Sequence, residues 1–409
     1  MLSCRILKFK HLNIMNSENK NRVLKTLAGL LKKNAQNIID QSTKDLLSLE
    51  KMDIALIERL KVDPRKIGSM IDSLTSISDA KDPENENIYT FTHSNGMKVV
   101  NKRVPFGSVL IIYESRPDVT IEAAAVAFKA GNKVLLKGGK EARFTNQYLT
   151  GLWNIALTIC NHDPEIVRYL DYTRIETQKL ISGDDMKIDL IIPRGGEELI
   201  NYVRNNSSIP VIASGRGNNF LYIHSQCDFE LAIDVILDGK RRIGVCNALD
   251  KVLIDKNLPD LQSCIDKLKN SLKNENIEIV DRTDIEISLV TPDDIMIAEI
   301  LKEEFLSKKI FITIVPGVEM AISIINTFSG GHSATIITSD NDAANEFLLQ
   351  TDCGAVYHNA STRFTDGGEF GLGAEIAIST QKLHSRGPIG INQLVTNKWF
   401  IYGNGQVRN

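Results

Sequence analysis

Cys246 is the residue of this chain whose type and setting most favour covalent chemistry. It lies in the segment RRIGVCNALDKVLID, between a predicted helix and an apolar strand over residues 251–254. The helix is predicted to begin after an N-cap at Asp228 and to end at Gly239. A thiol in such a connection can be reached by a ligand, and its thiolate is a strong nucleophile. The alternative is a small buried hydrophobic side chain, which describes most free cysteines.

Three glycine-bearing segments, residues 137–140, 193–196 and 215–218, follow predicted strands. Parallel sheets bind ligands at the carboxyl ends of their strands. Glycine lets the backbone approach a phosphate, and the N–H groups that open the next helix attract anions. None of the segments completes a G-x-G-x-x-G fingerprint, and each alone is a tight turn more often than a site. Their shared placement favours a nucleotide-binding crevice.

The run over residues 359–388 carries five glycines among hydroxyl and charged side chains, and it follows a strand directly. This composition is typical of a loop that closes over a polar ligand. Ser361, Thr362 and Arg363 are then available to bind phosphate or carboxylate. The alternative is a long surface loop, although long loops inside compact domains are usually functional.

Composition narrows the class of protein. The 409 residues suffice for about two or three domains, and 43% hydrophobic with 24% charged residues is ordinary for a globular protein. A net charge of −3 argues against nucleic-acid binding. No apolar run is long enough to span a membrane, and the histidines show no metal-binding spacing, so we expect no membrane and no metal.

The cysteines indicate the cellular compartment of the protein, and the first residues of the chain bear on whether it carries a targeting segment. The six cysteines form no C-x-x-C pair, and we find no secretory signal, which favours reduced thiols in the cytoplasm. Residues 1–14 carry three basic residues and no acid, and Met15 precedes a good helix start at Asn16 and Ser17. We therefore interpret residues 1–14 as a dispensable extension.

Periodicity predicts an α/β protein with two doubly wound α/β domains and a protruding β-hairpin. The first quarter is helical, and the hairpin, about residues 88–104, has Asn95-Gly96 at its turn, where both residues are expected at φ > 0. Beyond it, continuous apolar strands alternate with helices, which indicates parallel sheets covered on both faces. The predicted strands begin with 108–113, 132–137, 189–193 and 210–213, and continue with 251–254, 310–315, 334–338 and 355–358. The later helices are expected near 258–274, 293–304, 316–327 and 341–350.

Five blocks of this sequence together resemble the gamma-glutamyl phosphate reductase (glutamate-5-semialdehyde dehydrogenase) family of the aldehyde dehydrogenase superfamily. They occur in the family's order and span nearly the whole chain beyond about residue 17. The blocks are PFGSVLIIYESRPDVTIEAAAVAFKAGNKVLLKGGKEA, DLIIPRGGEELI, GVCNALDKVLI, SGGHSATIIT and NASTRFTDGGEFGLGAEIAISTQKLHSRGP.

The resemblance implies NADPH-dependent reduction of L-glutamyl 5-phosphate to L-glutamate 5-semialdehyde with release of phosphate, the second step of proline synthesis from glutamate. By implication, the Cys246 thiolate forms a thioester that hydride then reduces, with N–H groups near Asn247 holding the oxyanion. Hydrolytic relatives carry a glutamate in the stretch that corresponds to residues 213–216, where this chain has no acid. The alternatives are a hydrolytic dehydrogenase of a small aldehyde and a non-catalytic scaffold of the same fold.

The resemblance also implies the ligands of the site. Lys137 matches a lysine at the adenosine ribose, Lys140 favours NADP over NAD, and Glu304 matches a glutamate at the nicotinamide ribose. Arg116, His332, Ser361, Thr362 and Arg363 are the candidates for the glutamyl and phosphate groups. The predicted cofactor-binding residues are Lys137, Gly138, Lys140, Pro193, Arg194, Gly195, Gly196, Gly215 and Glu304.

We expect a cofactor-binding domain over residues 1–227, a catalytic domain over 228–384 and an oligomerising tail over 385–409. The expected partners are a small-molecule substrate, further copies of this chain and a glutamate kinase.

Overall fold

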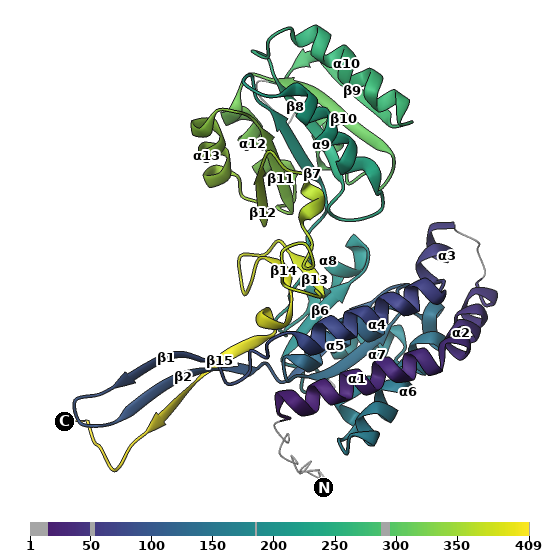
Figure 1. Ribbon diagram of the computed structural model, residues 1–409, viewed down its shortest axis with the longest axis vertical. Coiled ribbons are helices and arrows are strands. Elements are labelled where there is room, and N and C mark those ends of the chain that lie inside the picture. Colours follow the sequence, from purple (N-terminus) through teal and green to yellow (C-terminus); the bar gives the residue numbers. More distant parts are fainter. Residues whose placement is uncertain (1–14, 50–53, 185, 288–294, 409) are drawn as a thin grey trace. The chain divides into compact units, whose positions relative to one another are not determined.

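The computed structural model describes residues 15–49, 54–184, 186–287 and 295–408, and the chain divides into two compact units (Figure 1). Unit 1 comprises Met1–Val211 with Gly390–Asn409, and unit 2 comprises Ile212–Ile389. The α/β class is confirmed in both. The boundary at Val211 precedes the predicted one at residue 227, because strand β7 (Asn219–Ile223) pairs with strands of unit 2. The predicted extension, residues 1–14, lies outside the described residues.

Helix α1 (Ser17–Lys33) begins where the Asn16 side chain accepts a hydrogen bond from the backbone N–H of Asn19. This N-cap confirms the predicted helix start. One apolar face of this helix is turned inward, with Val23, Leu24, Leu27 and Leu31 fully buried. The helices that follow are α2 (Ala35–Leu47), α3 (Ile54–Leu60) and α4 (Pro64–Asp79).

The main sheet of unit 1 has the strand order β5-β4-β3-β6, and its strands run parallel. Leu110 and Ile112 pack on the α7–α8 side, so the alternate residues Val109 and Ile111 face the opposite side, and all four are buried. The strands are β3 (Ser108–Tyr113), β4 (Lys133–Gly138), β5 (Val167–Tyr169) and β6 (Leu190–Arg194), and the helices are α5 (Val119–Lys129), α6 (Arg143–Ile159), α7 (Arg174–Ser182) and α8 (Glu197–Asn206).

From β3 the chain builds outward through β4 to β5 and then returns to place β6 on the other side of β3. The strand order therefore reverses between β3 and β6. Ligands of open α/β sheets bind at the carboxyl ends of the strands at such a reversal.

The predicted hairpin is confirmed as β1 (Asn87–Thr92) and β2 (Lys98–Pro105). Its turn differs from the prediction: Gly96 has φ of 86°, but Asn95 is not among the residues with positive φ. His93 and Met97 close a three-residue loop in which one glycine takes the left-handed conformation. Strand β15 (Val395–Tyr402), from the tail, pairs with β2 and completes a three-stranded arm (Figure 1).

Unit 2 is built on one six-stranded parallel sheet with the order β12-β11-β7-β8-β10-β9. Helices α9 and α10 cover one face and α11, α12 and α13 the other, which confirms double winding. The strands are β7 (Asn219–Ile223), β8 (Leu249–Asp255), β9 (Glu278–Glu286), β10 (Lys309–Val315), β11 (Ser333–Ile337) and β12 (Ala355–His358). The helices are α9 (Phe229–Arg241), α10 (Leu261–Asn274), α11 (Ile295–Lys302), α12 (Val318–Phe328) and α13 (Asn341–Gln350). The short elements of the chain are η1 (Lys140–Ala142), η2 (Pro164–Ile166), η3 (Thr362–Phe364), η4 (Ile391–Gln393), β13 (Ala377–Ser379) and β14 (Gly387–Ile389).

Two local predictions were wrong. Helix α9 starts at the predicted N-cap Asp228 but continues past Gly239 to Arg241. A Cβ at Gly239 would lie 2.6 Å from Cβ of Leu249, so this glycine serves close packing of α9 on β8. Residues 210–213 were expected to form a strand, yet they contribute one bridge, between Ile191 and Val211.

Over the residues that the structure describes, no helix combines the length and the apolar character needed to cross a membrane.

Candidate active site

Cys246 lies on a tight turn between α9 and β8, and its side chain is partly exposed. The backbone N–H of Ala248 donates to the carbonyl of Val245 at 3.1 Å, which closes the turn around residues 246 and 247. The turn precedes β8 and therefore lies at the amino edge of the sheet. The candidate nucleophile is thus partly exposed, but at the edge opposite to the one where such sheets usually bind ligands.

The prediction that residues 215–218 follow a strand was wrong, because they precede β7 at this same amino edge. Gly217 lies against the turn: a Cβ there would be 2.0 Å from the carbonyl oxygen of Cys246. The Asn219 amide donates to the carbonyls of Cys246 at 2.8 Å and Ala248 at 2.6 Å. Gly215 packs against Thr380, where a Cβ would be 2.3 Å from the hydroxyl oxygen.

Asn247 connects the turn to the segment over residues 361–366. Its side-chain nitrogen donates to the carbonyls of Arg363 and Thr365, each at 3.1 Å, and its oxygen accepts from the Arg363 guanidinium. Both amide hydrogens are therefore engaged by carbonyls. Asn247 is not available as a side-chain oxyanion donor, and its observed role is to hold the loop of Arg363 beside Cys246.

Ser361 and Thr362 were predicted as substrate ligands, but both side chains are buried, at 5% and 1% exposure. The Thr362 hydroxyl donates to the carbonyl of Asn247 at 3.0 Å, and the Ser361 hydroxyl accepts from the backbone N–H of Arg363 at 3.2 Å. These hydroxyls stabilise the loop and are not presented to a ligand. Arg363 is partly exposed and lies next to Asn247, and it remains the candidate ligand for phosphate.

His332 was also predicted as a substrate ligand, yet it is fully buried. Its Nδ1 lies 2.8 Å from the Ser333 hydroxyl, which in turn lies 2.7 Å from that of Thr365. Burial lowers the pKa of His332 to about 4, so the ring is neutral at ordinary pH. The histidine therefore supports the segment beside Cys246 from within.

Glu304 lies just after α11 and is partly buried. Its Oε1 accepts from the backbone N–H of Gly217 at 3.1 Å. Because Gly217 also packs against Cys246, it contacts both the predicted nicotinamide-ribose ligand and the candidate nucleophile.

In unit 1, Lys137 and Lys140 lie at the carboxyl end of β4. Lys137 is partly buried, and its Nζ donates to the carbonyl of Gly138 at 2.7 Å. Burial lowers the pKa of Lys137, with Asp171 and Glu141 acting in the opposite direction. Lys140 is exposed. Two cations at one strand end fit the ribose and phosphate of a nicotinamide dinucleotide.

Gly138 serves packing, since a Cβ there would lie 2.2 Å from Nδ2 of Asn146 on α6. At the strand reversal, the carbonyl of Arg194 accepts from the N–H of Glu114, and the Glu114 carboxylate accepts from the N–H of Gly196 at 2.8 Å. A Cβ on Gly195 would lie 2.4 Å from this carboxylate. Glu114 thus binds the amino end of α8, where an anion is favoured. Pro193 is buried inside β6.

Arg116 is exposed in the loop between β3 and α5. Lys66 and Glu122 lie within electrostatic range of it. Burial raises the pKa of Glu122 to about 7, and the neighbouring Asp118 adds to the effect. This cluster lies in unit 1, whereas Cys246 and Arg363 lie in unit 2.

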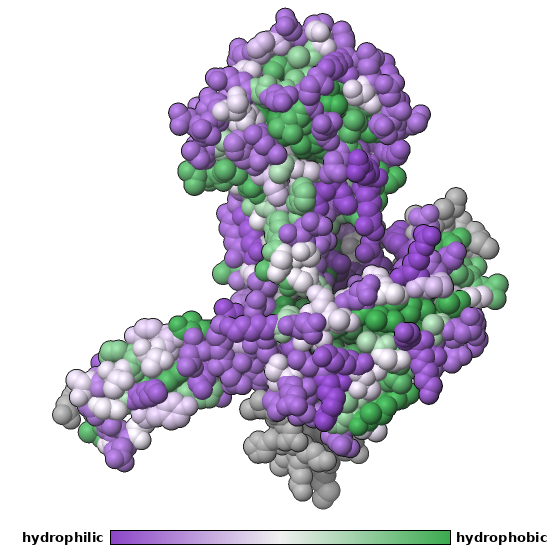
Figure 2. All heavy atoms as spheres, in the orientation of Figure 1, coloured by the Kyte–Doolittle hydropathy of each residue, from purple (hydrophilic) through white to green (hydrophobic). Residues whose placement is uncertain are grey.

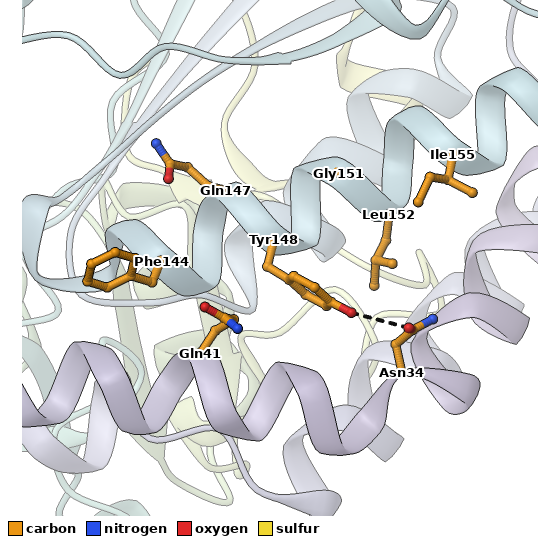
Figure 3. A pocket seen from close by; sticks show the side chains of 8 residues that line it. All are labelled: Asn34, Gln41, Phe144, Gln147, Tyr148, Gly151, Leu152 and Ile155. Atoms are coloured by element: carbon orange, nitrogen blue, oxygen red, sulfur yellow. Dashed lines mark hydrogen bonds between the residues drawn. The ribbon is translucent and has the colours of Figure 1, made fainter.

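A pocket of about 410 Å³ lies between α2 and α6 (Figure 3). In Figure 3 the Tyr148 hydroxyl points across it and donates to Oδ1 of Asn34 at 3.2 Å. It contains none of the predicted site residues, so we assign no chemistry to it. Its lining consists of Asn34, Gln41, Phe144, Gln147, Tyr148, Gly151, Leu152 and Ile155.

Sequence reasoning missed several residues that build the site. Within residues 215–218, Gly217 is the glycine that contacts Cys246, and it was not among the predicted site residues. The sequence signal that could have indicated it is a glycine between two polar residues, Arg216 and Asn218. Asn219 and Thr365 had no signal, because their bonds join residues far apart in the chain. Within the described ranges, no group of three or more His, Cys, Asp or Glu side chains could hold a metal ion.

Comparisons with known proteins agree with this architecture. Residues 7–294 match the model of the aldehyde dehydrogenase family. The chain is 41% identical over 402 residues to a gamma-glutamyl phosphate reductase of Nautilia profundicola, covering 96% of each chain. It is 40% identical over 408 residues to one of Legionella pneumophila strain Corby, covering 97% of this chain and 96% of the relative.

Solved structures show the same likeness. The crystal structure of gamma-glutamyl phosphate reductase from Thermotoga maritima is 32% identical and has a TM-score of 0.88, covering 97% of this chain and 96% of its own. A glyceraldehyde-3-phosphate dehydrogenase from Methanocaldococcus jannaschii, solved with NADP, has a TM-score of 0.68 at 15% identity, covering 96% and 91%. At this lower sequence identity, the structural likeness supports the fold alone.

Proposed function

Because the chain belongs to the aldehyde dehydrogenase family, we propose that it reduces L-glutamyl 5-phosphate to L-glutamate 5-semialdehyde with NADPH and releases phosphate. This is the second step of proline synthesis from glutamate. The observation that carries the proposal is that Cys246 is partly exposed on a turn fixed by Asn219, Asn247 and Gly217. The resemblance of the chain to gamma-glutamyl phosphate reductases supplies the substrate.

In the first half-reaction, the Cys246 thiolate attacks the acyl carbon of the substrate. The carbon–sulfur bond forms, the bond to the phosphate oxygen breaks, and phosphate leaves with the electron pair. The backbone N–H groups of Cys246 and Asn247 are the proposed donors to the developing oxyanion, since the Asn247 side-chain amide and the Ala248 N–H are engaged elsewhere. Arg363 is the proposed ligand of the departing phosphate, because a guanidinium has five N–H donors and Asn247 engages one nitrogen.

In the second half-reaction, the thioester is reduced to a hemithioacetal, which collapses to the aldehyde and the free thiolate. A bound NADPH supplies the hydride. We propose that Lys137 and Lys140 bind its adenosine ribose and 2′-phosphate and that Glu304 binds its nicotinamide ribose. Residues 213–216 contain no acid that could activate water, so the thioester persists for reduction.

Three further proposals accompany this function. We propose that the enzyme is a homo-oligomer that associates through its arm, because the arm exposes large apolar side chains. The five described cysteines are free thiols, which fits the cytoplasm. A glutamate kinase is the proposed supplier of the substrate, since acyl phosphates are made by phosphoryl transfer to a carboxylate.

The function is tested in the oxidative direction, by phosphate-dependent reduction of NADP with glutamate semialdehyde. Cys246→Ser should lower turnover at least about 1000-fold, since the serine hydroxyl is a far weaker nucleophile. Cys264→Ser is the matched control, because Cys264 is also partly exposed, and it should keep full activity. Turnover by Cys246→Ser would refute the mechanism, and turnover without phosphate would indicate a hydrolytic dehydrogenase.

A further inference from the structure

The segment that carries Glu304 is held at every residue from 301 to 305. Asn218 donates to the carbonyl of Leu301 at 2.7 Å, and Arg216 donates to that of Lys302 at 3.2 Å. Lys251 Nζ donates to the carbonyl of Glu303 at 2.7 Å.

The remaining two residues are bound through other groups, a side-chain oxygen of Glu304 and the backbone N–H of Phe305. Glu304 itself accepts from Gly217, and the backbone N–H of Phe305 donates to Oδ2 of Asp250 at 2.9 Å. These five hydrogen bonds join residues 301–305 to residues 216–218 and to the first part of β8.

Asp250 and Lys251 are consecutive residues of β8, four and five positions after Cys246. They bind the backbone on either side of Glu304, at Phe305 and Glu303 respectively. The other oxygen of Asp250 pairs with Lys240 Nζ at 2.6 Å, and Lys240, Asp250 and Lys251 are all buried to 2% exposure or less.

Lys251 also lies over the ring of Phe305, with its Nζ 3.7 Å from the ring centroid. Burial lowers the pKa of Lys251 to about 7, with Asp250 acting in the opposite direction. A buried amine costs free energy of folding, and a methionine of similar length would pack here without that cost. Packing therefore does not explain why a lysine occupies position 251, whereas its hydrogen bond to the carbonyl of Glu303 does.

We infer that Asp250 and Lys251 are positioning residues that fix Glu304 relative to Cys246. They do so by joining the segment over residues 301–305 to the strand that begins behind the nucleophile. The inference rests on the proposed function, because that function assigns Glu304 to the nicotinamide ribose. Rigid placement of a binding group matters, since a displacement of about 1 Å can cost about 100-fold in rate.

The test is Lys251→Met, with binding of NADPH measured directly by fluorescence titration. We expect the dissociation constant to rise about tenfold while the thermal unfolding midpoint stays within a few degrees, since loss of one donor loosens Glu304 without opening a large cavity. The KM for NADP should rise similarly, and kcat should change less.

Lys309→Met is the matched control. Lys309 also lies over the Phe305 ring, at 4.6 Å, and its Nζ is 4.0 Å from the Glu303 carboxylate, but no bond from it to the backbone of residues 303–305 is among those of the described residues. NADPH binding by this variant should equal that of the wild type. Equal effects of the two substitutions would overturn the inference, because they would assign the change to the cation over the ring.

The double variant Lys251→Met/Glu304→Ala separates positioning from general structural support. If Lys251 acts through Glu304, the double variant binds NADPH as Glu304→Ala does. Independent, additive losses would overturn the inference. If Lys251→Met does not fold, Lys240→Met/Asp250→Ala removes the acceptor at Phe305 without leaving Lys240 buried and unpaired, and unchanged NADPH binding by that variant would overturn the inference equally.

These titrations do not depend on turnover. A wild-type protein that binds NADPH but shows no phosphate-dependent turnover would refute the proposed function. The inference would then stand or fall on the binding constants of the variants alone.

Discussion

Gly217 lies against the backbone of Cys246 so closely that a Cβ on it would be 2.0 Å from the Cys246 carbonyl oxygen and 2.4 Å from its Cα. Real Cβ atoms do not approach other atoms to this distance. Position 217 therefore accepts only glycine unless the turn that carries Cys246 moves. Because the Gly217 N–H also donates to Glu304, a movement here would displace both the candidate nucleophile and the predicted ligand of the nicotinamide ribose.

Gly217→Ala should lower kcat at least about 100-fold, because the Cys246 turn must shift by more than an ångström to admit the methyl group. The rate of Cys246 alkylation by iodoacetamide should change with it, and circular dichroism should report a retained fold. Gly68→Ala is the control, since nothing lies within 4 Å of a Cβ at that position in α4. Full activity of Gly217→Ala would show that the turn adapts freely and would contradict the packing argument.

Lys140→Glu should shift cofactor preference from NADP toward NAD, because a carboxylate repels the 2′-phosphate that an exposed lysine would bind. We expect the ratio of kcat/KM for NADP over NAD to fall about tenfold or more, largely through a higher KM for NADP. Lys133→Glu, at the opposite end of the same strand, should leave the ratio unchanged. Equal ratios in the wild type and Lys140→Glu would remove Lys140 from the cofactor site.

His332 should make the protein less stable in acid. Its folded pKa of about 4 lies below the ordinary value of 6.5, so between these values the unfolded chain binds a proton that the folded chain does not. The stabilising effect is complete above pH 6.5 and is lost as the pH falls toward 4. From pH 6.5 to 5 the loss is about 2 kcal/mol of unfolding free energy.

Urea denaturation at several pH values measures this loss. His332→Asn lowers stability at neutral pH but should decline less on acidification, by about that same 2 kcal/mol. His93→Asn, in the exposed turn of the arm, is the control for removal of a histidine. Parallel declines in the wild type and His332→Asn would show that other groups govern acid stability.

The arm should mediate self-association. Tyr89 and Trp399 are each half exposed and form an edge-to-face ring contact with centroids 5.9 Å apart. Figure 2 shows hydrophobic surface along this arm. The other large apolar side chains exposed on it are Ile88, Phe91, Ile401 and Tyr402.

The double variant Tyr89→Glu/Trp399→Glu should dissociate to monomers in light scattering, because charges at the centre of an apolar contact are not paired. Phe144→Glu, which alters an exposed aromatic on α6, should keep the wild-type mass. A monomeric wild-type protein would exclude the proposed role of the arm.

Much of the fold could be predicted because its signals are local. Asn16 and Asp228 both cap helices as predicted, since a capping side chain binds a backbone N–H two or three residues away. The continuous apolar strands are buried on both faces as expected. The hairpin formed at the predicted place, but its turn type was wrong, because loop length and strand register decide which residues take φ > 0.

The residues of the predicted site divide into those that are partly exposed and those that are buried. Cys246 is partly exposed on its turn, and Arg363 binds the neighbouring Asn247, so both stay candidates for the roles that the resemblance implies. His332, Ser361 and Thr362 are buried supports instead of ligands, because polar side chains near a site serve its scaffold as readily as its substrate. A sequence does not show whether a given hydroxyl will stabilise the scaffold or bind the substrate.

The sequence by itself determined the order and type of the elements, the connection that carries the thiol and the resemblance that indicates the reaction. Only the tertiary structure placed Cys246 at the amino edge of its sheet, joined β15 to a hairpin almost 300 residues earlier and buried Lys251 behind Glu304. Helix caps and apolar periodicity are set by neighbours within a few residues. Strand order and the burial of a charged side chain depend on which distant segments exclude water together, and that depends on the packing of the whole unit.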